Sequence, residues 1–155
     1  MDAIDKQKYI FGSIFLLANR LQVVGDQYLG RDDITTKQWF LNVMISQFGD
    51  NPPTLSEVAE LMGNSRQNVK QLALKLVEKG FLTIEKDGHD ARALRLVLTD
   101  KSRRFWGKRQ KQDDEYLEDL FRSFSLEEID VMCKGFGKLF EKIKKLEKLS
   151  NGRMY

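Results

Sequence analysis

Residues 55–80 read LSEVAELMGNSRQNVKQLALKLVEKG, with apolar positions recurring at helical spacing on both sides of one glycine. The pattern predicts two short amphipathic helices. Gly63 lies where the turn between them needs a positive φ, which glycine adopts without a Cβ clash. Ala59 is small enough for the helices to cross closely, and the Ser65 hydroxyl can cap the second helix. Together these offsets predict a helix-turn-helix.

The second of these helices has a polar side unusually rich in amides and cations. Val69, Leu72, Ala73 and Leu76 form its apolar stripe, so the other side chains are expected to point away from the core. Amides can bond adenine or phosphate, cations can reach guanine or phosphate, and a helix N-terminus favours phosphate. The predicted DNA-contacting residues are Ser65, Arg66, Gln67, Asn68, Lys70, Gln71 and Lys75. The alternative is an ordinary solvated helix face.

Two β-strands are predicted after the helix pair, over residues 81–86 and 94–98, with a charged connection between them. Such a strand pair turns a helix-turn-helix into a winged one. Arg92 in the connection is predicted to enter a minor groove, because the negative potential there attracts guanidinium groups. Asp90 is expected to hold the loop or Arg92 in place, and His89 to be a solvated loop histidine.

The remaining pattern is helical. Periodicity predicts a helix over residues 4–29, and a Thr-x-x-Gln capping box at Thr35 opens a second helix that ends near residue 48. Thr99 can cap a helix that ends near residue 121, and a Ser-x-x-Glu box at Ser125 opens a last helix to about residue 149. The predicted fold class is mainly α, an α+β winged helix-turn-helix with about six helices and a two-stranded β-wing.

Charge is unevenly distributed along the 155 residues, a length that suits one domain or one domain with an extension. The net charge is +3, but residues 54–112 hold 13 Lys and Arg against 7 Asp and Glu. A basic middle suggests a polyanionic partner, and a chance excess on a solvated surface is the alternative. The N-terminus lacks the basic region of a secretory signal and no apolar run spans a bilayer. We therefore expect a cytoplasmic protein without a membrane partner.

Catalytic chemistry has few candidate residues. Cys133 is the only cysteine, which excludes an intrachain disulfide and suits a reducing compartment. We expect it to be a buried structural thiol, and the alternative is a peroxide sensor. No Cys–His pair, metal cluster, nucleophile motif or glycine-rich phosphate loop occurs, which leaves only carboxylate chemistry open. The sequence therefore predicts no enzyme, and no metal or cofactor is expected.

The chain resembles the MarR-type (multiple antibiotic resistance regulator) winged-helix transcription factors over nearly its whole length. The resemblance lies in ITTKQW at 34–39, LSEVA at 55–59, LVEKGF at 76–81, and Asp90-Ala91-Arg92 leading into Val97-Leu98-Thr99. It implies an obligate homodimer, with residues 1–33 and 100–155 as dimerisation helices and residues 34–99 as the DNA-binding winged helix-turn-helix domain. It also implies a pseudo-palindromic site on double-stranded DNA, transcriptional regulation that is most often repression, and a small phenolic or anionic effector.

Several features qualify this resemblance. The terminal helices hold more apolar residues than so thin a domain can bury alone, which independently favours two-fold association.

Gln71 stands where the family often has a basic residue, so an amide contact is expected to replace an ionic one. Leu74 and Val77 stand where charges are usual, and either add packing or narrow the DNA-facing surface. Ser102 stands at a common glycine and is expected to be neutral. The alternative function is a winged-helix protein–protein interaction module without DNA binding, for which Leu74 is the hint.

Overall fold

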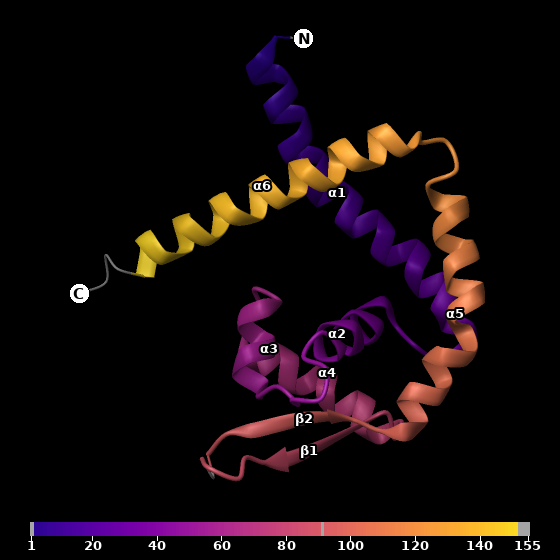
Figure 1. Cartoon of the computed structure of the whole chain (residues 1–155), viewed down its shortest axis with the longest axis vertical. Helices are drawn as coiled ribbons and strands as arrows, with labels where there is room; N and C mark the ends of the chain where they lie inside the picture. Colours follow the sequence, from indigo (N-terminus) through magenta and orange to yellow (C-terminus); the bar gives the residue numbers. More distant parts are fainter. Residues whose placement is uncertain (1, 91, 152–155) are drawn as a thin grey trace. The chain divides into compact units, whose positions relative to one another are not determined.

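The computed structural model describes residues 2–90 and 92–151, and it confirms the predicted order of elements (Figure 1). The elements are α1 (Ala3–Leu29), the 3-10 helix η1 (Gly30–Asp32), α2 (Thr36–Ser46), α3 (Leu55–Leu61), α4 (Arg66–Glu78), β1 (Leu82–Lys86), β2 (Leu94–Leu98), α5 (Asp100–Leu120) and α6 (Leu126–Asn151). Over the described residues the protein therefore has six α-helices and a two-stranded antiparallel sheet. The predicted boundaries hold to within about two residues.

The chain divides into two units, an N-terminal unit (Met1–Gly107) and a C-terminal unit (Lys108–Tyr155). The helix-turn-helix, the wing and the start of α5 all belong to the N-terminal unit. The C-terminal unit holds the rest of α5 and all of α6. None of the described helices has the length and apolar character needed to cross a membrane.

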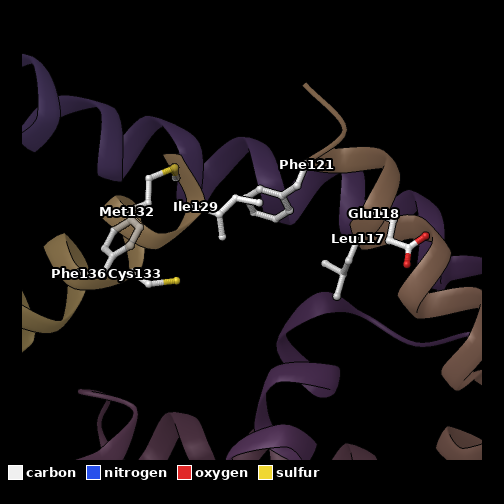
Figure 2. A pocket seen from close by; sticks show the side chains of 7 residues that line it. All are labelled: Leu117, Glu118, Phe121, Ile129, Met132, Cys133 and Phe136. Carbon is white, nitrogen blue, oxygen red and sulfur yellow. The ribbon is translucent and has the colours of Figure 1, made fainter. Parts of the chain in front are cut away.

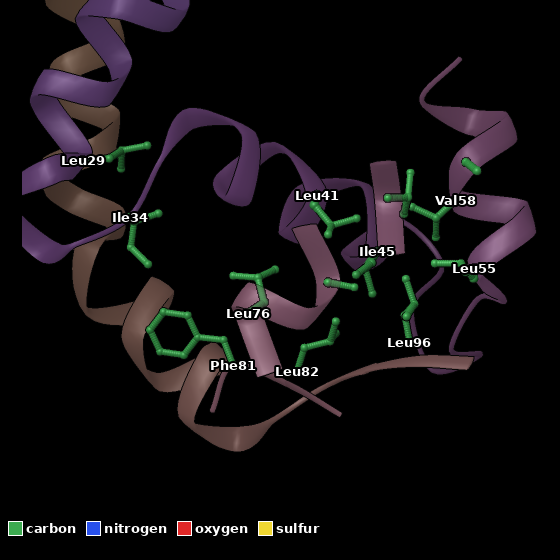
Figure 3. Close-up of a cluster of buried hydrophobic side chains, with 13 residues drawn as sticks. Leu29, Ile34, Leu41, Ile45, Leu55, Val58, Leu76, Phe81, Leu82 and Leu96 are labelled. Atoms are coloured by element: carbon green, nitrogen blue, oxygen red, sulfur yellow. The ribbon is translucent and has the colours of Figure 1, made fainter. Parts of the chain in front are cut away.

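The core of the N-terminal unit lies among α2, α3, α4 and the sheet (Figure 3). Its fully buried side chains include Leu41, Val58, Val69, Ala73, Leu76 and Leu96. Each large side chain of this kind contributes about 1.5–3 kcal/mol of burial free energy. In β1 and β2 the register pairs Leu82 with Leu98 and Ile84 with Leu96, so the apolar side chains of the two strands share one face. This cluster fixes α4 and the wing on one folded body.

Local caps fix where the helices begin. The Thr35 hydroxyl accepts a hydrogen bond from Gln38 N–H at 3.2 Å, while the Gln38 side chain accepts from Thr35 N–H, so the predicted capping box is present. Ser125 makes the same arrangement at the start of α6, with Glu128 as its partner. Thr99 caps α5 by accepting from Ser102 N–H at 3.2 Å. Each cap satisfies backbone donors that the helix itself leaves without partners.

In the C-terminal unit, the end of α5 and the start of α6 line an open apolar pocket of about 530 Å³ (Figure 2). Its lining residues are Leu117, Glu118, Phe121, Ile129, Met132, Cys133 and Phe136. Cys133 is exposed, so the prediction of a buried thiol is wrong for the single chain. The physical reason is that α6 leaves its apolar residues exposed, Phe140 among them at 70%.

Candidate nucleic-acid interface

Helix α4 presents its polar side outward, as the sequence predicts. Its buried residues are Val69, Ala73 and Leu76, and Leu72 is half-buried against the core. The seven predicted contact residues Ser65, Arg66, Gln67, Asn68, Lys70, Gln71 and Lys75 are all exposed. Gly63 has a φ of +59°, so the turn before α4 uses the left-handed conformation that was expected. The exposed face is therefore a direct consequence of the turn and the apolar stripe.

The start of α4 is organised by three polar residues. The Ser65 hydroxyl accepts a hydrogen bond from Asn68 N–H at 3.2 Å, which confirms it as the N-cap. The Asn64 side-chain oxygen accepts from Ser65 N–H at 2.9 Å and from Asn68 Nδ2 at 3.1 Å. Asn68 is thus held by its neighbours, and Asn64 is a supporting residue that the sequence reasoning missed. An asparagine just before an N-cap serine is a local signal for this arrangement.

The ion pairing of its cations distinguishes this surface. Among the residues described by the structure, Arg66, Lys70, Lys75 and Arg92 make no ion pair. In contrast, Arg103 at the start of α5 pairs with Asp100 at 3.1 Å. Cations without internal partners keep their full charge available for phosphate oxygens.

The three departures on α4 are all on the surface. Gln71 is exposed, and Leu74 and Val77 are 45% and 37% exposed. Leu74 and Val77 do not belong to the buried core, and the two expectations for them, extra packing or a narrower DNA-facing surface, both stay predictions. Gln71 remains available for an amide contact.

The wing loop, residues 87–93, is closed by its own hydrogen bonds. Asp90 accepts from Arg92 N–H at 2.9 Å, and its carbonyl accepts from Ala93 N–H at 2.9 Å. The prediction that Asp90 holds the loop is confirmed, and it acts on the backbone of Arg92. The side chains of Arg92 and His89 are exposed. Ala91, part of the motif that suggested the family, lies outside the described residues.

Two further residues hold the wing, and the sequence reasoning missed both. Asp87 accepts hydrogen bonds from Asp90 N–H at 2.9 Å and His89 N–H at 2.8 Å, and its second oxygen accepts from Arg95 Nε. These donors, the two backbone N–H groups first, lower the pKa of Asp87 to about 2. The Asp-Gly pair at 87–88 is a turn signal from which the backbone part could have been read. No sequence signal points to the Arg95 contact.

Ser102 also does more than expected. It is 1% exposed, and its hydroxyl donates to Asn42 Oδ1 at 2.8 Å, which joins the start of α5 to α2 inside the N-terminal unit. The expectation of a neutral replacement therefore overlooked a buried side-chain hydrogen bond. Such a bond fixes the start of α5 against the N-terminal unit, which carries α4.

No protein-family model matches the chain. The transcriptional activatory protein BadR of Rhodopseudomonas palustris is 22% identical over 140 residues, covering 89% of this chain and 80% of that protein. A MarR transcriptional regulator from Methanosarcina mazei superposes with a TM-score of 0.77 at 19% identity, covering 90% of this chain and 99% of the other. The S. aureus MepR–DNA complex gives a TM-score of 0.73 at 21% identity, covering 87% and 96%. With the six α-helices and the wing of its described residues and with these likenesses, the chain has the winged helix-turn-helix fold of the MarR-type regulators.

Proposed function

We propose that the chain is a DNA-binding transcriptional regulator that holds duplex DNA with α4 and the wing loop. The observation that carries this proposal is the outer face of α4. It begins with a capped N-terminus and presents three cations beside exposed amides, opposite the buried Val69, Ala73 and Leu76; among the described residues, those cations have no ion-pair partner. A solved relative by fold, MepR, is in complex with DNA, which supports the same use of this fold.

The residues of α4 have distinct roles in this proposal. The backbone N–H groups at its start and the cations Arg66, Lys70 and Lys75 bind phosphates, which sets affinity and orientation. Gln67 and Gln71 read base edges, because an amide can donate and accept at adenine in the major groove. Arg92 enters the adjacent minor groove. Asp90 holds the backbone of Arg92 and makes no DNA contact.

The regulator acts as a homodimer in this proposal, with residues 1–33 and 100–155 as the dimerisation helices. Large apolar side chains on α1 and on α6 are exposed in the single chain, including Phe11 at 67% and Leu126 at 82%. Leaving many such residues in water is unfavourable, and a second copy would bury them. A two-fold axis then places two α4 helices about one DNA turn apart, roughly 10 base pairs, on a pseudo-palindromic site.

The regulatory consequence is repression relieved by a small phenolic or anionic effector, as the family resemblance implies. BadR is an activatory protein by its name, so activation is the alternative to repression. A winged-helix module that binds protein is the second candidate, because Leu74 and Val77 put apolar surface on α4. The polar residues around them favour DNA.

Selection of bound fragments from random duplex DNA tests the proposal. The native protein should enrich a pseudo-palindrome whose half-sites are roughly 10 base pairs apart. A variant with Gln67→Ala and Gln71→Ala should bind DNA with little sequence preference, because its phosphate contacts remain. The matched control, Lys37→Gln, changes an exposed lysine on α2, outside α4, the wing loop and the proposed dimerisation helices, and should select the same sequence as the native protein. A folded protein that enriches no sequence and retains no duplex at low salt would favour the protein-binding module.

A further inference from the structure

Arg95 is a wing cation whose guanidinium is turned toward the protein. It lies on β2, and two of its nitrogens donate to segments far apart in the sequence: Nε to Asp87 Oδ2 in the wing loop, and Nη1 to the carbonyl oxygen of Pro52 ahead of α3. The Asp87 side chain is only 7% exposed and that of Arg95 is 37% exposed. The guanidinium thus joins two loops through donors in a fixed planar arrangement.

On the wing side, contacts lead from Arg95 to Arg92. Asp87 uses its other carboxylate oxygen to accept the N–H groups of His89 and Asp90, and Asp90 in turn accepts Arg92 N–H at 2.9 Å. Asp87 N–H also donates to the carbonyl oxygen of Ala93 at 3.0 Å, which closes the base of the loop. The backbone position of Arg92 therefore depends on where Asp87 is held.

On the other side, Pro52 belongs to a segment fixed on the helix-turn-helix. The next residue, Pro53, is buried and accepts Leu96 N–H at 2.8 Å. Thr54 forms an isolated bridge with Arg95 and caps α3 in a capping box with Glu57. Helix α3 packs against α4, and the turn at Gly63 connects the two helices. The Pro52 carbonyl therefore has a fixed position relative to α4.

We propose that Arg95 is a positioning residue that fixes the wing loop on the helix-turn-helix, so that Arg92 and α4 reach the same DNA duplex in one geometry. This inference rests on the proposed function, since Arg92 is its DNA-contacting partner. In this proposal Arg95 makes no phosphate contact, and its Nε and Nη1 are directed to Asp87 and Pro52. The two wing arginines thus have different roles: Arg92 contacts DNA, and Arg95 contacts the protein.

A double-mutant cycle on the salt dependence of duplex binding tests this assignment. Arg92→Ala is expected to lower the slope of log affinity against log salt by about 0.9 for each subunit, the value for one phosphate contact. Arg95→Met should lower the slope by as much, because Arg92 loses its position. The variant that carries both changes should match either single variant. A double variant whose loss is the sum of the two would show that Arg95 contacts DNA itself, and would overturn the proposal.

A second measurement separates this proposal from the proposed function. Hydrogen exchange of the His89 and Asp90 amides in the free protein should become faster in Arg95→Met, while the amides of Val69 and Ala73 in α4 keep native protection. Asp87→Asn keeps an oxygen for the two amides and removes the ionic partner of Arg95, so it should reproduce the slope change without dismantling the turn. Arg95→Lys should have a slope between those of Arg95→Met and the native protein, since one ammonium group cannot reproduce the two directed donors of the guanidinium.

The outcomes are distinct. If the native protein binds no duplex, the proposed function fails, and unchanged exchange at His89 and Asp90 in Arg95→Met would then overturn the positioning role as well. If the native protein binds DNA but Arg95→Met and Asp87→Asn keep the native slope, Arg95 is not a positioning residue. The positioning role is supported by faster amide exchange in the wing loop of Arg95→Met together with slope changes that do not add in the double variant.

Discussion

The junction of α1 and α2 contains a contact too close for any side chain larger than hydrogen. A Cβ added to Gly25 would lie 2.5 Å from Thr36 Oγ1. Thr36 cannot move freely, because its N–H donates to Asp26 Oδ1 at 2.7 Å and its hydroxyl donates to the Gln22 carbonyl at 3.2 Å. Thr36 is also the first residue of α2, so this contact fixes the direction in which α2 follows α1. We predict that Gly25→Ala destabilises the protein.

The expected magnitude follows from two opposing effects. Forcing an extra methyl into a packed contact costs about 1–3 kcal/mol. Alanine in a helix interior is favoured over glycine by about 1 kcal/mol. The free energy of unfolding should therefore fall by about 0–2 kcal/mol in Gly25→Ala. In the same helix, Gly12 has no heavy atom within 4 Å of an added Cβ, so Gly12→Ala gains the helix preference alone. The difference between these two variants measures the cost of the contact.

Urea unfolding at one fixed protein concentration measures both variants, because the stability of an oligomer depends on concentration. Gly25→Ala should be less stable than Gly12→Ala by about 1–3 kcal/mol. In a Thr36→Ala background the obstructing hydroxyl and methyl are gone, so the penalty for Gly25→Ala should shrink. A Gly25→Ala variant as stable as Gly12→Ala, or a penalty unchanged without Thr36, would refute the reasoning.

Three further predictions concern single hydrogen-bonding groups. Ser102→Ala should lower the free energy of unfolding by about 1–3 kcal/mol, since it leaves the buried Asn42 oxygen without its donor. Ser46→Ala, at an exposed serine, is the control, and equal effects of the two changes would contradict a stabilising role for the Ser102 hydrogen bond. Ser65→Ala should cost about 1 kcal/mol through loss of the cap, and unchanged thermal unfolding would argue against it. Asp87 has its pKa lowered to about 2 in the folded state, below the roughly 3.9 of an unfolded aspartate, so the stability it contributes is complete above about pH 4 and lost as pH falls toward about 2. Urea unfolding against pH should show that Asp87→Asn removes this part of the acid dependence, and an identical profile would contradict it.

The predictable parts of this fold are those with local causes. Gly63, Ser65 and the capping box at Thr35 act within three or four residues, and the structure has each of them as the sequence indicated. The buried stripe of α4 follows from helical spacing, and its exposed side follows from the stripe. These local agreements also support the fold as a whole, since each element favours the same arrangement.

Two unpredicted contacts join residues distant in the sequence. Ser102 bonds Asn42 across 60 positions, and Arg95 reaches Pro52 across 43. The sequence pattern around a polar side chain does not identify a distant hydrogen-bond partner. The sequence therefore predicts that Arg95 lies on a strand, but not which residues its guanidinium contacts. Cys133 was misjudged for a related reason, because an apolar helix predicts burial only when something covers it. The dimer helices and the DNA contacts stay predictions.

The salt dependence of duplex binding tests the central claim, that the outer face of α4 binds DNA through its cations. The native protein is compared with a variant in which Arg66, Lys70 and Lys75 are glutamine, on a duplex selected by the native protein. If each cation neutralises one phosphate, the slope of log affinity against log salt falls by about 2.7 for each subunit. The Lys37→Gln control should keep the native slope. A folded triple variant with the native affinity and slope would contradict the account.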